Sequence, residues 1–270
     1  MIGTVEDAYN LYKEGYSLVK ISKMMKVNRT RITNLLKEQY GIVPNLCNRK
    51  AINESYFYDI NSPDSAYWLG FLMGDGYINS TKGDLELGLK IEDLPHLIKF
   101  TSALNSEHKV SIKEVKLKGK VYQSCRVCIK NKKLVGDLNS LGCNSTKTYT
   151  STIPKLPKNL IPHFIRGLLD ADGSLTMYSR PSGTIACVIS LTTASPIMVY
   201  KYSNVLKETL DISANFYVKK GTTCYSVVVS ADNDSYKLLN WLYADSTNDI
   251  RLERKYNVYK HMIAELDRNI

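Results

Sequence analysis

Two aspartates, Asp75 and Asp172, each end an apolar segment and are each followed directly by glycine. The first segment reads YWLGFLMGDGY over residues 67–77, and the second reads FIRGLLDADGS over residues 164–174. Two carboxylates brought together repel each other unless a cation lies between them. A hard divalent ion such as Mg²⁺, held by one or two carboxylates and by phosphate oxygens of a substrate, suits such a pair.

Apolar segments of this length predict buried helices, and glycine inside a helix costs about 1 kcal/mol relative to alanine, so these glycines need a reason. In the first segment and directly before it, the small residues Ala66, Gly70 and Gly74 lie four apart, which places them on one helix face. The second segment has the same spacing between two small residues. Faces without large side chains let two helix backbones approach closely. The predicted helix-interface positions are Gly70, Gly74, Gly167 and Ala171.

The ends of the two predicted helices decide where the acids lie. Gly76 and Gly173 are predicted to end them in the left-handed conformation that often terminates helices. Packing of the two helices would then bring Asp75 and Asp172 side by side at one end of the pair.

The two segments resemble the paired signature of the LAGLIDADG homing endonucleases, in the form that carries both copies on one chain. The resemblance implies that the last acid of each motif, Asp75 and Asp172, is catalytic and binds the metal. It also implies Mg²⁺ as the cofactor, with Mn²⁺ able to substitute. The acid two residues earlier is Asp170 in the second copy but Met73 in the first. This departure leaves open whether the two half-sites are equally active.

Further site residues follow from the same resemblance. The carbonyl groups of Gly74 and Ala171 are implied to assist in binding the metal. Related intein-type enzymes keep a lysine ahead of an Ile-Pro step before the second motif, and Lys147 resembles it. The second-half counterpart is less clear, because Asn248 aligns where a lysine is expected. Among the basic residues of 251–255, Arg251 is the catalytic candidate.

The residues after each motif predict the same order of elements twice, by hydrophobic periodicity and turn signals. In the first half, strands are predicted at 77–80, 84–92, 109–117 and 121–130, and helices at 94–104 and 132–141. In the second half, strands are predicted at 175–178, 184–192, 212–219 and 223–230, and helices at 196–210 and 234–243. With the motif helix first, each half reads αββαββα. The predicted fold class is α+β, with two four-stranded antiparallel sheets around a pseudo-two-fold axis.

A curved antiparallel sheet can follow a groove of DNA with alternate side chains facing the bases. Polar residues alternate with apolar ones in the predicted strands, and the chain carries 36 basic and 26 acidic residues, a net charge of +10. Such a charge favours binding to phosphates and release of counterions. The candidate DNA-binding residues of the sheets are Lys90, Lys113, Arg126, Arg180 and Lys219.

The first 40 residues predict three short amphipathic helices that resemble the helix-turn-helix domains of recombinases and transposases. Asn28 would cap the third helix, and exposed residues of that helix would reach the major groove or its phosphates. The candidate DNA-binding residues here are Asn28, Arg29, Thr30, Arg31, Thr33 and Asn34. The predicted domains are a helix-turn-helix domain (1–40), a linker (41–63), a first LAGLIDADG half (64–157) and a second half (158–270).

Other classes of site are disfavoured. Cys125 and Cys128 have zinc-ligand spacing, but residues three apart in a strand point to opposite faces, and no second pair accompanies them. The four histidines are scattered, which disfavours a His-based nuclease or a nucleophilic triad. Without a signal peptide or an 18-residue apolar span, the protein is expected in the cytoplasm of a bacterial or phage-infected cell, or in an organelle.

These patterns together predict a monomeric, Mg²⁺-dependent, site-specific endonuclease that cuts both strands of a long double-stranded DNA target, as mobile-element enzymes do. A non-cleaving transcription regulator on the same fold is one alternative. An intron RNA-splicing maturase is another, although the helix-turn-helix favours DNA over RNA.

Overall fold

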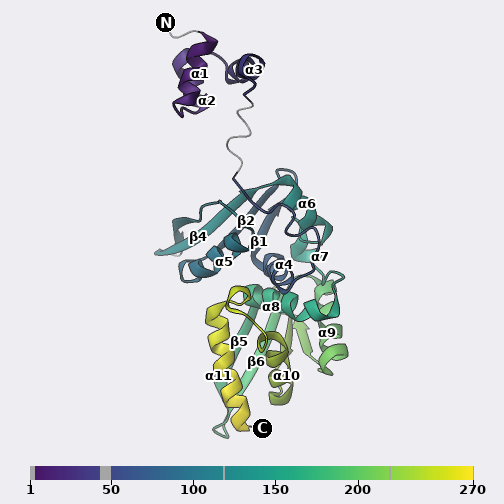
Figure 1. Cartoon of the computed structure of the whole chain (residues 1–270). Helices are drawn as coiled ribbons and strands as arrows, with labels where there is room; N and C mark the ends of the chain where they lie inside the picture. The colour runs from purple at the N-terminus through teal and green to yellow at the C-terminus, as the bar shows by residue number, and fades with distance from the viewer. Residues whose placement is uncertain (1–3, 43–49, 118, 219, 270) are drawn as a thin grey trace. The chain divides into compact units, whose positions relative to one another are not determined.

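The chain forms two compact units, Met1–Ala51 and Ile52–Ile270. The computed structural model describes residues 4–42, 50–117, 119–218 and 220–269 (Figure 1). Part of the predicted linker, residues 43–49, therefore lies outside the described residues, and so does Lys219. Within the described residues no helix is long and apolar enough to span a lipid bilayer.

The smaller unit consists of three helices, α1 (Val5–Lys13), α2 (Leu18–Met25) and α3 (Arg29–Tyr40). Each begins at a polar residue whose side chain accepts a hydrogen bond from the first turn, which satisfies one of the free N–H groups there. These capping residues are Thr4, Ser17 and Asn28. The core contains Ala8, Ile21, Ile32 and Leu36. The apolar spacing that predicts three helices is thus realised as a packed unit.

The first half of the larger unit follows the predicted αββαββα order. Its elements are α4 (Pro63–Asp75), β1 (Gly76–Asn79), β2 (Asp84–Lys90), α5 (Leu94–Ala103), β3 (Ser111–Leu117), β4 (Lys120–Lys130) and α6 (Lys132–Ser140). The strands form one antiparallel sheet in the order β1-β2-β4-β3. Phe57 and Ile60, inside the predicted linker, are buried in the core of this unit.

The second half repeats this order. Its elements are α8 (Ile161–Asp172), β5 (Gly173–Ser179), β6 (Ile185–Thr193), α9 (Pro196–Leu210), β7 (Asn215–Val218), β8 (Tyr225–Val229) and α10 (Asp232–Tyr243). The sheet order is β5-β6-β8-β7, which matches that of the first half. The α+β class and the repeated topology are therefore confirmed. The 3₁₀ turn η2 (Ile91–Asp93) lies between β2 and α5. Outside the repeats lie the short α7 (Lys147–Thr150), the 3₁₀ turns η3 (Lys158–Leu160) and η4 (Asn248–Ile250), and the long α11 (Glu253–Asn269).

The two motif helices, α4 and α8, pack directly against each other between the two sheets (Figure 1). A Cβ on Gly70 would lie 2.0 Å from the carbonyl oxygen of Phe164, and a Cβ on Gly167 would lie 2.0 Å from that of Tyr67. Both distances are far shorter than any van der Waals contact. The small-residue faces thus meet backbone to backbone, which is the reason for glycine at both positions.

The glycines after the acids have a different role from the one predicted. Gly76 and Gly173 are extended, with φ of −69° and −84°, and each leads straight from its motif helix into a strand. The prediction of left-handed helix ends is therefore wrong. At both positions a Cβ would lie 2.6 Å from the carbonyl oxygen of the residue four earlier, Leu72 or Leu169. Glycine is needed there because the turn from helix to strand leaves no room for a side chain.

Candidate active site

The acids Asp75 and Asp172 end α4 and α8 and lie together at one end of the helix pair. An Asp172 carboxylate oxygen lies only 3.1 Å from the position that a Cβ on Gly74 would occupy. Both aspartates keep access to solvent. Partial burial, reinforced by the negative charge of Asp172, raises the pKa of Asp75 to about 6. Partial burial also raises the pKa of Asp172 above its ordinary value. The pair is therefore a site where negative charge is unfavourable until a cation arrives.

Lys147 lies beside this pair, as the sequence predicts. It is the first residue of the short helix α7, and its amine donates hydrogen bonds to the carbonyl oxygens of Met73 (2.7 Å) and Gly74 (2.6 Å). Burial lowers the pKa of Lys147, although the neighbouring carboxylates of Asp172 and Asp75 act in the opposite direction. An ammonium group has three donors, so one remains after these two contacts.

The second basic residue beside the acids is Lys255, from the first turn of α11. Its amine donates hydrogen bonds to the carbonyl oxygens of Leu169 (2.5 Å) and Gly173 (2.7 Å), on either side of Asp172 in the sequence. The residue is only 6% exposed, and burial lowers the pKa of Lys255 to about 8. The charge of Lys255 lowers the pKa of both acids, as does that of Lys147.

Arg251, the residue assigned from sequence, lies elsewhere. Its guanidinium donates to the carbonyl oxygen of Ser246 (3.0 Å), forms an ion pair with Glu253 (3.5 Å) and lies over the Tyr256 ring (3.5 Å to the ring centre). Lys255 takes the position beside the acids instead, because α11 begins at residue 253 and turns residue 255 toward α8. The sequence contains this residue within the basic group 251–255 but does not show which member faces the site.

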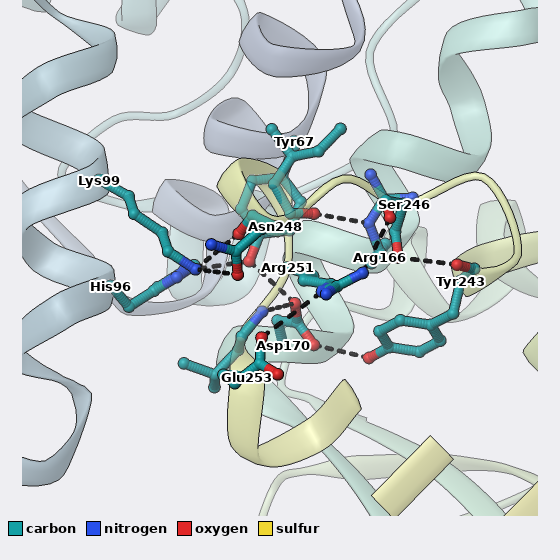
Figure 2. Close-up of polar contacts among 12 residues, drawn as sticks. Tyr67, His96, Lys99, Arg166, Asp170, Tyr243, Ser246, Asn248, Arg251 and Glu253 are labelled. Atoms are coloured by element: carbon teal, nitrogen blue, oxygen red, sulfur yellow. Dashed lines mark hydrogen bonds and ion pairs between the residues drawn. The ribbon is translucent and has the colours of Figure 1, made fainter. Parts of the chain in front are cut away.

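A buried polar network adjoins the site, and sequence reasoning missed it (Figure 2). The Asp170 carboxylate accepts hydrogen bonds from the hydroxyls of Tyr67 (2.8 Å) and Tyr243 (2.6 Å). Because the single hydroxyl proton of Tyr67 goes to Asp170, the 3.0 Å contact between Tyr67 and His96 requires the His96 Nε2–H to donate. The sequence feature that could have indicated this network is Asp170 itself, an acid within a predicted apolar helix, since a buried carboxylate needs hydrogen-bond partners.

The acid pair fits a hard divalent cation. Within the described residues, no group of three or more His, Cys, Asp or Glu side chains could hold a metal ion. A site with two carboxylates suits Mg²⁺, which keeps several waters and binds substrate phosphate oxygens. Burial and the negative charge of Asp172 raise the pKa of Asp75, and a bound cation would offset both effects. Asp75 and Asp172 would hold it, and the carbonyl oxygen of Gly74, although bonded to Lys147, keeps a second lone pair.

The face of the first sheet opposite its helices is basic. The pairing places Lys90 and Lys113 opposite Ser124 on either side, so the three side chains form one row across β2, β4 and β3. Arg126 lies on the same face and forms an ion pair with Glu86 (2.9 Å). Three of the predicted DNA-binding residues are thus brought together on one exposed surface. Cys128 is exposed there and Cys125 is buried, as the strand alternation predicts.

The corresponding face of the second sheet is different. Its described strand residues carry no charge; they include Ser174, Thr176, Tyr178, Ser190, Thr192, Asn215 and Tyr217. Arg180, predicted to bind DNA, makes a two-pronged ion pair with Asp232 (2.7 and 2.6 Å) at the start of α10. The Asp232 carboxylate therefore compensates the charge of Arg180.

In the smaller unit, the predicted residues of α3 fall into two groups. Arg29, Thr30, Arg31 and Asn34 are exposed on the helix surface. Asn28 is used as the helix cap, with its side-chain oxygen 2.8 Å from the amide nitrogen of Thr30, and the Thr33 hydroxyl donates to the carbonyl of Arg29. The exposed side chains of Arg29, Thr30, Arg31 and Asn34 are therefore the ones available to contact a ligand.

A cavity of about 370 Å³ opens between Lys147 and Asp172. Its walls include Lys147, Ser151, Asp172, Thr192 and Cys224. The cavity is mixed in polarity, with a cation and an anion facing the same space. It offers room for a phosphate group and its waters next to the candidate metal position.

Comparison with known proteins supports the same fold. Residues 160–239 match the family model of the LAGLIDADG-like domain. The homing endonuclease I-WcaI, solved with its DNA recognition sequence, aligns with a TM-score of 0.53 and 15% identity over 82% of this chain and 96% of that chain. The meganuclease I-SmaMI, solved with uncleavable DNA, aligns with a TM-score of 0.52 and 11% identity over 76% and 91%. No curated protein matches the sequence.

A third structural match is full-length DUF199/WhiA from Thermatoga maritima, with a TM-score of 0.48 and 15% identity. It covers 79% of this chain, and this chain spans 64% of the length of that protein. At 15% and 11% sequence identity, the two endonuclease matches establish the fold of this chain. The larger unit has the two-repeat fold of the LAGLIDADG homing endonucleases, and the resemblance inferred from the two motifs is confirmed.

Proposed function

We propose that the chain is a site-specific DNA endonuclease that hydrolyses both strands of a long duplex target with a divalent metal at Asp75 and Asp172. The observation that carries this proposal is the meeting of the two acids at the end of a closely packed helix pair, with one lysine on each flank. Because one chain carries both motifs, a monomer would suffice. The basic face of the first sheet supports DNA as the partner.

Hydrolysis of a phosphodiester joins a water oxygen to phosphorus, breaks the bond to the 3′ oxygen and delivers a proton to that oxygen. Asp75 and Asp172 would hold a divalent cation, which would supply charge neutralisation and a lowered pKa for the attacking water. The protein positions the acids through the helix pair. Lys147 and Lys255 place positive charge on either flank, where the negative charge of the five-coordinate phosphorus develops.

The direct test is cleavage of a randomised duplex library by the full chain in Mg²⁺ and in Ca²⁺. Site-specific double-strand cuts in Mg²⁺, with binding alone in Ca²⁺, are the expected result. Tight duplex binding without cutting in Mg²⁺ or Mn²⁺ would instead identify a non-cleaving DNA-binding protein on this fold. Stronger binding to structured intron RNA than to duplex DNA would favour a maturase.

Lys147→Met is expected to slow cleavage of one strand by about 10²-fold, because a charged donor beside the reacting phosphate is lost. Single-turnover cleavage of a duplex labelled on each strand measures this effect. Lys158→Met, which removes an exposed lysine from η3, is the matched control and should cut at the wild-type rate. Equal rates for Lys147→Met and wild type would remove Lys147 from the mechanism.

We also propose that the smaller unit is a helix-turn-helix domain that binds DNA through α3. Arg31→Gln should weaken duplex binding and lower the slope of log affinity against log salt by about 1, because one phosphate contact is lost. Titrations at several salt concentrations measure the slope. Arg268→Gln, which removes a surface arginine paired with Glu265 on α11, is the control. An unchanged slope for Arg31→Gln would contradict a phosphate contact at this residue.

A further inference from the structure

The carboxylate of Asp170 is almost fully buried and has a third hydrogen bond besides those from the two tyrosines. It accepts from the backbone N–H of Leu252 at 2.8 Å. Asp170 is 1% exposed, so this bond forms away from water. Hydrogen bonds to a buried carboxylate are among the stronger contacts in a protein. The position of the Leu252 peptide is therefore strongly fixed by α8.

Leu252 is the residue directly before α11. Its carbonyl oxygen accepts from the backbone N–H groups of Lys255 and Tyr256, both at 3.0 Å, which are the first bonds of the helix. Three residues after Leu252, the Lys255 amine returns to α8 and bonds the carbonyls of Leu169 and Gly173. The start of α11 is thus attached to the end of α8 at two points, the Asp170 carboxylate and the carbonyl groups of Leu169 and Gly173.

Other contacts fix the segment that leads into α11. Arg166 of α8 donates to the carbonyl oxygens of Ile250 (2.8 Å) and Leu242 (2.6 Å). From the first half, Lys99 donates to Asn248, as Figure 2 shows. These contacts hold the segment around the turn η4. The hydrogen bond that Asp170 accepts holds Leu252 itself, the residue from which α11 continues.

The first half lacks this arrangement. Met73 stands at the position equivalent to Asp170, so no carboxylate is available there. Lys147 comes from the four-residue helix α7 and bonds the carbonyls of Met73 and Gly74 rather than the residues equivalent to Leu169 and Gly173. The two lysines are thus placed by different means on the two sides of the acid pair.

We propose that Asp170 is a positioning residue for Lys255, so that cutting of one target strand depends on Asp170 while cutting of the other depends on Lys147. The inference rests on the proposed endonuclease function. It predicts that the two DNA strands are then cut at unequal rates. Loss of the Asp170 carboxylate slows cleavage only of the strand cut beside Lys255, so a nicked duplex accumulates.

The test compares Asp170→Asn with wild type in single-turnover cleavage of a duplex labelled separately on each strand. The expected result is a slowing of one strand by at least about tenfold relative to the other. Lys255→Met should slow the same strand, and Lys147→Met the opposite one. Equal slowing of both strands per folded molecule, or no slowing, would overturn the proposal, since a general loss of structure does not select a strand.

A second readout does not require activity. In wild type, Lys255 is buried and Lys147 half-buried, so an amine-acetylating reagent followed by mass spectrometry should modify Lys255 slowly. Asp170→Asn should raise the labelling rate of Lys255 by at least about fivefold and leave that of Lys147 unchanged. An unchanged rate at Lys255 would reject the positioning role even if the chain proved not to cut DNA.

If Asp170→Asn does not fold, Tyr243→Phe replaces it in both experiments. This variant removes one hydrogen-bond donor to Asp170 and keeps the ring in the core. The expected shifts in strand ratio and in Lys255 labelling have the same direction and are smaller. If Tyr243→Phe leaves both quantities at wild-type values, the link between Asp170 and Lys255 is refuted. Absence of cleavage by wild type would instead refute the endonuclease function.

Discussion

Replacing Asp75 or Asp172 with asparagine is expected to lower double-strand cleavage by about 10³-fold or more, because loss of several kcal/mol of charge stabilisation lowers the rate by this factor. Asparagine keeps the shape of the side chain but removes the charge that holds a divalent cation. Binding of the duplex in Ca²⁺ should change little, because the sheets and α3 supply the expected DNA contacts.

Single-turnover cleavage in Mg²⁺ and equilibrium binding in Ca²⁺, measured on the same variants, separate the two effects. Asp211→Asn is the matched control, because this exposed aspartate follows α9 and pairs with the surface residue Lys207. Wild-type cutting by both Asp75→Asn and Asp172→Asn would contradict the two-acid centre.

The Asp75→Asn variant has a second expected effect, on the stability of the folded chain in the absence of metal. Burial and the Asp172 charge raise the pKa of Asp75 to about 6, above its ordinary value of 3.8. Between these values the folded chain binds more protons than the unfolded chain, so stability falls as the pH rises through this window. Asp75→Asn should therefore be more stable than wild type at pH 7.5, by about 1 kcal/mol after allowance for solvent screening. Denaturant unfolding with EDTA should show this gain vanish below about pH 4, and added Mg²⁺ should stabilise wild type selectively.

The sequence predicts where the two acids lie and which helix faces meet, because both are encoded locally. Gly70 and Gly167 stand at helical spacing within apolar runs, where only a close backbone approach explains glycine, and the structure has that approach. The order of strands and helices follows for the same reason, since the hydrophobic period changes at each boundary. The left-handed ends assigned to Gly76 and Gly173 fail because each helix leads straight into a strand, a constraint set by the sheet.

Residues whose role depends on partners distant in sequence could not be assigned in this way. Lys255 reaches the acids from the start of α11, a segment that bonds Asp170 and Arg166 across more than eighty residues of sequence. Arg180 is basic and follows a strand, yet Asp232 neutralises it. Charge and spacing predict which residues are available, whereas the packing of α10 and α11 decides which of them face the site.

Gly70→Ala and Gly167→Ala are each expected to destabilise the protein by about 3 kcal/mol, near the upper end for overpacking of a core. The added Cβ would lie 2.0 Å from a backbone carbonyl oxygen of the opposite motif helix, and backbone cannot rotate away as a side chain can. The helices must separate, which also moves Asp75 relative to Asp172. Because a displacement of about 1 Å can cost about 10²-fold in rate, cleavage per folded molecule should fall as well.

Gly136→Ala is the matched control, since Gly136 also lies inside a helix, α6, but a Cβ there would meet no atom within 4 Å. It should stabilise the chain by up to about 1 kcal/mol, because alanine is the better helix former. Chemical denaturation of the three variants, with cleavage measured at equal folded concentration, compares them directly. If Gly70→Ala were as stable and active as Gly136→Ala, α4 and α8 would not be in backbone contact, and the helix pair could not be what sets the spacing of the two acids.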